Sequence, residues 1–157
     1  MLSISSPFRH GFARPLLAIA FVAGLAACGS NSNNGSTGPG NVSGTYTLQS
    51  VGGNSLPYTF PNSSKEIVVT SATLHLNADN SYSVSAAGSA NGTSDNNVIA
   101  DAGTYSVSGS TVTFTSTTFS GAHYTAAATS TSITADAPGA FVSSSNTSFS
   151  FLFEKAN

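Results

Sequence analysis

The chain is expected to fold as an all-β domain, and two features of its sequence predict this. From Val42 onward, apolar and polar residues alternate with a period of two, and no window of eleven residues shows the apolar period of a helix. Clusters of Asn, Asp, Gly and Ser separate the alternating segments, as is typical of short strands joined by tight turns. Together these features predict an antiparallel meander.

About eight strands are expected. Their apolar positions are Tyr46 and Leu48; Ala72, Leu74 and Leu76; Tyr82, Val84 and Ala86; Tyr105 and Val107; Val112 and Phe114; Tyr124, Ala126 and Ala128; Ile133 and Ala135; and Phe149, Phe151 and Phe153. Polar turns are expected at residues 77–80, 108–110, 120–121 and 130–132. Each strand has one hydroxyl-rich face and one apolar face, which predicts a sheet wrapped around a single interior.

An antiparallel up-and-down barrel is therefore the leading architecture, and a two-sheet β-sandwich is the alternative. The barrel is favoured because closure removes the strand edges, which promote aggregation in a chain rich in Thr and poor in charge. Only 6% of the residues are charged. The part after residue 27 has two cations against six acids, a formal charge of −4. This part has no cluster of Lys or Arg that could bind phosphates, which excludes nucleic-acid binding.

The first 27 residues have the plan of a secretory signal peptide. Arg9 and Arg14 give a positive start, and an uncharged apolar run from Pro15 to Ala27 follows. As a helix this run would rise only about 20 Å, too short to span roughly 30 Å of hydrocarbon. Residues 1–27 are therefore expected to be a signal peptide rather than a membrane span.

Cys28 is the single cysteine, and it follows Leu25-Ala26-Ala27. This stretch resembles a lipobox, the processing site of bacterial prolipoproteins. The resemblance implies cleavage before Cys28, acylation of that residue with chains such as palmitate, and attachment to a membrane of the cell envelope. Gly29, in place of the Asp that retains such proteins at the inner membrane, implies the outer membrane. The alternative is an ordinary secreted protein with an incidental cysteine.

A flexible linker is expected next. Residues 28–41 comprise Cys28 and a segment dominated by Gly, Ser and Asn, which has too little apolar surface to fold. The folded domain is expected over residues 42–157.

The domain also resembles a known family. Asn41-Val-Ser-Gly44-Thr45-Tyr46 is similar to the first-strand signature of lipocalins, and more nearly to lipocalin-like domains of bacterial lipoproteins. Leu56-Pro57 and the later Gly103-Thr-Tyr105 fit the same pattern. Tyr46 stands where lipocalins have Trp, and the last strand has no Arg to pack against it. The resemblance implies an eight-stranded barrel that binds a small apolar molecule or lipid.

No catalytic or metal-binding signature is found, so no enzyme activity, cofactor or metal is expected. His75 is expected on the outer face between Leu74 and Leu76, and His123 borders a turn. Asp79 and Asp95 lie in turn-like segments that do not fit a calcium loop.

The sequence leaves two functions open. In the first, the inward aromatic and small residues line a ligand cavity; the expected lining is Tyr46, Tyr82, Ala86, Tyr105, Phe114, Tyr124, Ala126 and Phe151. In the second, the same residues fill the barrel, and the lipoprotein is a structural or interaction protein of the envelope. Its contacts would come from the hydroxyl-rich outer face or from loops expected at residues 57–64, 87–97 and 137–146.

Overall fold

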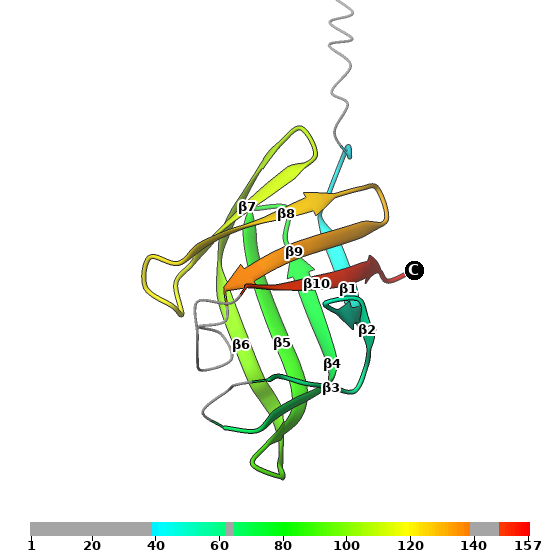
Figure 1. Ribbon diagram of the computed structural model, residues 1–157. Coiled ribbons are helices and arrows are strands. Elements are labelled where there is room, and N and C mark those ends of the chain that lie inside the picture. Colours follow the sequence, from blue (N-terminus) through cyan, green and yellow to red (C-terminus); the bar gives the residue numbers. More distant parts are fainter. Residues whose placement is uncertain (1–38, 62–64, 139–147) are drawn as a thin grey trace, which may run out of the picture. The chain divides into compact units, whose positions relative to one another are not determined.

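The computed structural model describes residues 39–61, 65–138 and 148–157 (Figure 1). These residues form ten strands: β1 (Gly44–Val51), β2 (Asn54–Ser55), β3 (Tyr58–Thr59), β4 (Ile67–Leu76), β5 (Ser81–Ala90), β6 (Thr93–Ser108), β7 (Thr111–Ser116), β8 (His123–Ala128), β9 (Ser132–Pro138) and β10 (Ser148–Lys155). The described part of the chain contains no helix that is long and apolar enough to cross a membrane.

The strands close into an antiparallel barrel. From β4 to β10 each strand pairs with the next in sequence, and β10 pairs with β1. The barrel closes because β1 also pairs with β4, with Gly44 opposite Leu76 and Thr47 opposite Thr73. Eight strands thus form the wall, and the two-residue strands β2 and β3 extend it beside β1 and β4. The up-and-down barrel predicted from the sequence is confirmed, and the two-sheet sandwich is not formed.

The predicted turns lie where polar clusters interrupt the alternation. In the β4–β5 turn, Asp79 accepts hydrogen bonds from the backbone N–H and the hydroxyl of Ser81, at 2.9 and 2.6 Å. Asn80 follows with a φ of 66°, in the left-handed region that Asn tolerates better than most residues. These local bonds fix the chain reversal without any contribution from the core.

The segment 87–97, expected to be a loop, is instead a continuation of β5 and β6. Ala90 pairs with Thr93 across a two-residue turn formed by Asn91 and Gly92, both with positive φ. Residues 93–97 of β6 are exposed, so they lack the alternation of buried and exposed side chains on which the strand prediction depended. The Asn-Gly pair, which favours two-residue hairpin turns, was the available signal.

The other two expected loops are described only in part. Within residues 57–64, Tyr58 and Thr59 form β3, and Phe60 is buried with 2% of its surface exposed. Within residues 137–146, Ala137 and Pro138 belong to β9, and the rest lie outside the described residues.

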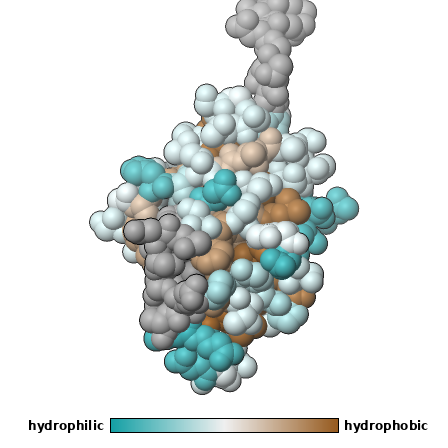
Figure 2. All heavy atoms as spheres, in the orientation of Figure 1, coloured by the Kyte–Doolittle hydropathy of each residue, from teal (hydrophilic) through white to brown (hydrophobic). Residues whose placement is uncertain are grey.

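The core consists of the inward faces of the barrel strands. The inward aromatic and alanine positions predicted by alternation are all buried or partly buried, with Tyr46 and Phe114 among the largest fully buried side chains. Val107 is the exception, with 42% of its surface exposed, because it lies at a barrel end just before the turn at Gly109. On the face shown in Figure 2 the surface is mostly of intermediate hydropathy, as expected from outward Ser and Thr.

Candidate ligand-binding cavity

The barrel interior contains a cavity of about 60 Å³. All eight strands of the wall contribute to its lining, which is apolar except for Asp101 and Tyr124. Four of the lining residues are alanines, at positions 72, 86, 135 and 137, and three are phenylalanines, at positions 114, 151 and 153. The cavity exists because these short side chains do not fill the space between the aromatic rings.

The structure divides the expected lining residues into two groups. Ala86, Phe114, Tyr124 and Phe151 lie in the wall of the cavity. The other four, Tyr46, Tyr82, Tyr105 and Ala126, are buried but are not among the residues that line the cavity, and their contact with a ligand stays a prediction.

Hydrogen bonds of the hydroxyl groups explain the positions of Tyr46 and Tyr105. Tyr46 donates to the carbonyl of Val42 and Tyr105 to the carbonyl of Asn77, both at 2.7 Å. Because a buried phenol needs a hydrogen-bond partner, these rings are held against the backbone beside the barrel end where β4 turns into β5. Alternation predicts that a side chain points inward, but it gives no position along the barrel axis.

The most polar feature of the interior is a buried carboxylate. Asp101 is only 3% exposed and accepts four hydrogen bonds. Its Oδ2 accepts from the hydroxyls of Tyr82 at 2.6 Å and Tyr124 at 3.1 Å. Its Oδ1 accepts from the hydroxyl of Ser116 at 2.5 Å and from the N–H of Ala102 at 2.8 Å. We call Asp101, Tyr82, Tyr124 and Ser116 the Asp101 cluster.

The four hydrogen bonds occupy the lone pairs of both carboxylate oxygens. All four donors are neutral, and no Lys, Arg or His is among the residues that line the cavity. The described part of the chain also has no buried side-chain nitrogen or oxygen without a hydrogen-bond partner. The charge of Asp101 is therefore stabilised by dipoles rather than by an ion pair.

Burial raises the pKa of the Tyr82 hydroxyl well above its ordinary value of 10.0, and the hydrogen bond to Asp101 raises it further. Burial also raises the pKa of Tyr124, as do the neighbouring Tyr82 hydroxyl and Asp101. Both phenols therefore stay protonated and act as donors to Asp101 at neutral pH.

Aromatic packing holds the two tyrosine rings in place. Phe114 stacks on Tyr124 with the ring centroids 4.8 Å apart, and Tyr82 meets Phe114 edge-on at 4.9 Å. The cluster thus joins β5, β6, β7 and β8 at one side of the cavity. Such rigid support keeps the hydroxyls aimed at Asp101.

The Asp101 cluster is not predicted above, although the sequence contains a signal for it. Tyr105 was expected to point inward, and counting back by two along the same strand places Gly103, Asp101 and Ile99 on the inner face. Asp101 was instead counted only among the acids that make the domain negative. A carboxylate at an inward position among several inward tyrosines indicates a buried hydrogen-bonded cluster.

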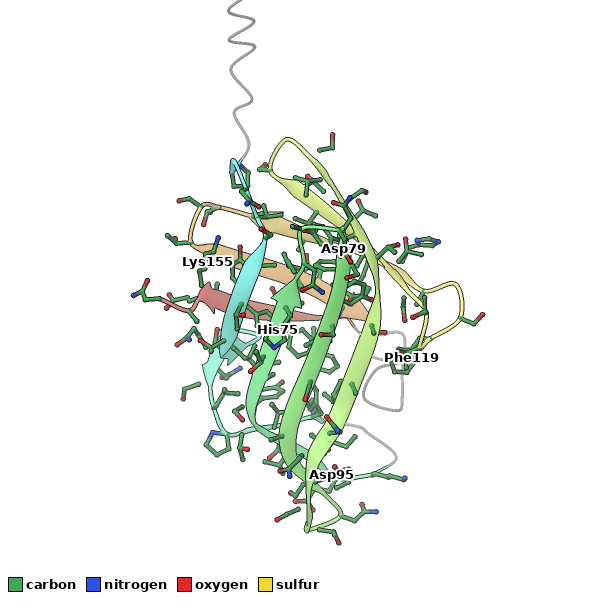
Figure 3. All side chains as sticks on the ribbon, turned by 180° about the vertical axis from the view of Figure 1, so that it is seen from behind. His75, Asp79, Asp95, Phe119 and Lys155 are labelled. Atoms are coloured by element: carbon green, nitrogen blue, oxygen red, sulfur yellow. The ribbon has the colours of Figure 1, made fainter. Side chains whose placement is uncertain are left out.

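The histidines lie outside this cavity. His75 and His123 are exposed, and their Nδ1 atoms lie within hydrogen-bond distance of Thr45 and Thr115. Asp79 lies in the β4–β5 turn as expected, but Asp95 belongs to strand β6 rather than to a turn. Figure 3 shows the two residues at opposite ends of the barrel, so they do not form a cluster. Among the described residues no group of three or more His, Cys, Asp or Glu side chains could hold a metal ion.

A cation covers the ring of Tyr46. Lys155 of β10 lies opposite Tyr46 of β1 in the strand register, with its Nζ 5.6 Å from the ring centroid. This distance is within the range of a cation–π interaction.

Comparisons with known proteins give no relative: no family model, no curated protein and no solved structure matches this chain. Cys28 and the residues before it lie outside the described residues. Any functional conclusion therefore depends on the residues of this chain and the geometry of its barrel.

Proposed function

We propose that this protein is a lipid-anchored lipoprotein of the bacterial cell envelope whose lipocalin-like barrel binds a small apolar group. The observation that carries the binding function is the apolar cavity of about 60 Å³, to which every strand of the wall contributes. Water finds few hydrogen-bond partners in a cavity lined by alanine and phenylalanine, so a hydrocarbon group binds there more favourably than water.

The size of the cavity limits the ligand. Drug-sized ligands occupy sites of roughly 300–1,000 Å³, and an apolar cavity of about 150 Å³ accommodates benzene. A cavity of about 60 Å³ therefore accepts a group of only a few heavy atoms, such as the end of an alkyl chain. The remainder of a longer ligand would lie outside the barrel.

The anchor rests on the sequence. Leu25-Ala26-Ala27-Cys28 follows an uncharged apolar run, and the residues after Cys28 suit a tether between membrane and barrel. Gly29 favours the outer membrane.

The pairing of Tyr46 with Lys155 supports the lipocalin-like assignment. In lipocalins, which the chain resembles, a Trp of the first strand packs against an Arg of the last strand. Here Tyr46 and Lys155 provide an aromatic ring and a cation at those two positions, and they lie opposite each other across β1 and β10. Tyr46 and Lys155 thus make the aromatic–cation contact that Trp and Arg make in lipocalins.

A structural or interaction role in the envelope is the second candidate function. The small size of the cavity favours it, because a nearly filled barrel is a rigid body that can present its hydroxyl-rich outer face to another protein. An exposed apolar patch at Tyr58, Phe60 or Phe141 would favour this role further, but Phe60 is buried and Tyr58 is partly buried. Phe141 lies outside the described residues.

Native mass spectrometry of the protein purified from the membranes of its own cell separates the two functions. Ligand binding predicts a retained small molecule with an alkyl or aryl group, which is lost on denaturation. A single mass equal to that of the acylated chain, together with no binding of small apolar probes in solution, would leave the interaction role.

A further inference from the structure

Asp101 gives the cavity a charge. It is the one acidic side chain in the cavity lining, and that lining contains no cation. The two lysines of the described residues do not offset this charge from within, since neither Lys65 nor Lys155 is part of the lining. The same lining contains four aromatic side chains, Phe114, Tyr124, Phe151 and Phe153, and the faces of such rings attract positive charge.

We propose that the cavity selects its ligand by the sign of its charge: it prefers a small alkyl group bearing an ammonium, accepts a neutral one, and rejects a carboxylate. This inference rests on the proposed ligand-binding function and names the chemical class of the ligand. The preferred class is a short alkylamine in its protonated form, or the amine-bearing end of a larger amphiphile.

The preference follows from the low polarity of the surroundings. Inside a protein a charge interacts far more strongly than in water, because the effective dielectric constant is lower. A ligand carboxylate would meet the like charge of Asp101 with no cation in the wall to separate them. An ammonium meets an opposite charge, and a fatty acid enters favourably only with its hydrocarbon end first.

The geometry of the Asp101 cluster provides a point of contact. The bond from Tyr124 to Oδ2 is the longest of the four, at 3.1 Å, and both Asp101 and Tyr124 line the cavity. Tyr82 and Ser116 do not line it, and they hold the carboxylate by shorter bonds of 2.6 and 2.5 Å. Because all lone pairs of the carboxylate are occupied, an ammonium would reach Oδ2 by replacing the Tyr124 hydroxyl, while Tyr82, Ser116 and the N–H of Ala102 keep the carboxylate in place.

The test compares three water-soluble probes of equal chain length: butylammonium, 1-butanol and butyrate. Their dissociation constants for the full chain are measured at pH 7 and low salt by saturation-transfer NMR. Butylammonium should bind at least about tenfold more tightly than butyrate, with 1-butanol between them. Equal affinities, or tighter binding of butyrate, would overturn the selectivity while leaving the proposed function intact. If none of the probes binds, the proposed function itself fails.

Variants locate the origin of the preference. Asp101→Asn should bring the butylammonium-to-butyrate affinity ratio close to one. Asp136→Asn is the matched control, since it removes an exposed carboxylate of β9 and should leave the ratio unchanged. Equal effects of the two substitutions would mean that the net charge, not the cavity, sets the preference.

Loss of fold in Asp101→Asn would not stop the test. Tyr124→Phe keeps the charge and removes one of its four donors, so one lone pair of Oδ2 becomes available to the ligand. The affinity ratio should then rise above that of the parent chain. A ratio that stays constant or falls would contradict the proposal.

Discussion

The ring of Tyr82 lies against Gly103, its partner on the neighbouring strand. The two residues are paired between β5 and β6, and a Cβ atom placed on Gly103 would be 3.0 Å from the Tyr82 ring and 2.0 Å from the carbonyl oxygen of Thr115 on β7. Three strands therefore approach each other closely at this position, two residues from Asp101. The glycine allows Tyr82 to reach the carboxylate.

Gly103→Ala should destabilise the barrel by about 1–3 kcal/mol, the usual range for overpacking, because the added methyl group meets backbone rather than a movable side chain. Urea unfolding followed by circular dichroism measures the change. Gly40→Ala is the control, since no atom lies within 4 Å of its added Cβ. Equal stability of the two variants would mean that β5, β6 and β7 are farther apart than described.

Removing a core aromatic tests the inward face of the barrel. Phe114→Ala should cost about 3–5 kcal/mol, because Phe114 is 1% exposed and packs against Tyr82, Tyr105 and Tyr124. Phe151→Ala should cost less, since this ring is only partly buried and borders existing space. Chemical denaturation of both variants gives the order, and the reverse order would show that the core is centred elsewhere.

Two alanines distinguish the cavity from the packed core. Ala86→Val should partly fill the cavity, preserve stability and weaken the binding of 1-butanol, because Ala86 lines the cavity. Ala126→Val should instead overpack and cost about 1–3 kcal/mol, because Ala126 is 4% exposed and is not part of the lining. Thermal melts and probe titrations of both proteins check this. Destabilisation by both substitutions would indicate a filled barrel.

High pH should unfold the protein through its tyrosines. Burial raises the pKa values of Tyr46, Tyr82, Tyr105 and Tyr124, so the unfolded chain releases these protons first. Stability is then fully present below about pH 10, the unfolded value, and is lost as the pH rises from there towards the folded values.

The Tyr82 hydroxyl alone contributes a slope of at most about 1.4 kcal/mol per pH unit in this alkaline range. Unfolding free energies between pH 8 and pH 11 should therefore fall less steeply in Tyr82→Phe than in the parent chain. Tyrosinate absorbance should rise together with the loss of β structure. Ionisation of all the tyrosines while the barrel stays folded would contradict the burial of these hydroxyls.

Cys28→Ser tests the anchor. The substitution removes the thiol that the lipobox-like stretch presents, so labelling by a fatty-acid probe and processing of the precursor should both be lost in the producing bacterium. Metabolic labelling and membrane fractionation measure these effects. A variant that is still labelled and still sediments with membranes would show that the chain is held by other means.

The barrel could be predicted from the sequence because its strands are half-buried and because closure requires each strand to present one apolar face. The same reasoning failed for residues 87–97, whose strands extend beyond the core and therefore lack an apolar face. Within the site, Ala86 and Phe151 were placed in the lining, but Tyr46 and Tyr105 were not distinguished from them. Their positions depend on hydrogen bonds to the carbonyls of Val42 and Asn77, and the alternation of apolar residues does not predict these bonds.

Closure of the barrel joins the two ends of the domain. Tyr46 of the first strand pairs with Lys155 of the last, so the wall is complete only when nearly the whole chain is present. A chain synthesised from its N-terminus must keep β1 with one side unpaired until β10 is present. Premature loss of β10 would leave two open edges, on β1 and on β9, in a sequence with few charges to prevent association. The last eight-residue strand therefore decides whether the folding chain closes its barrel or keeps open edges that can associate.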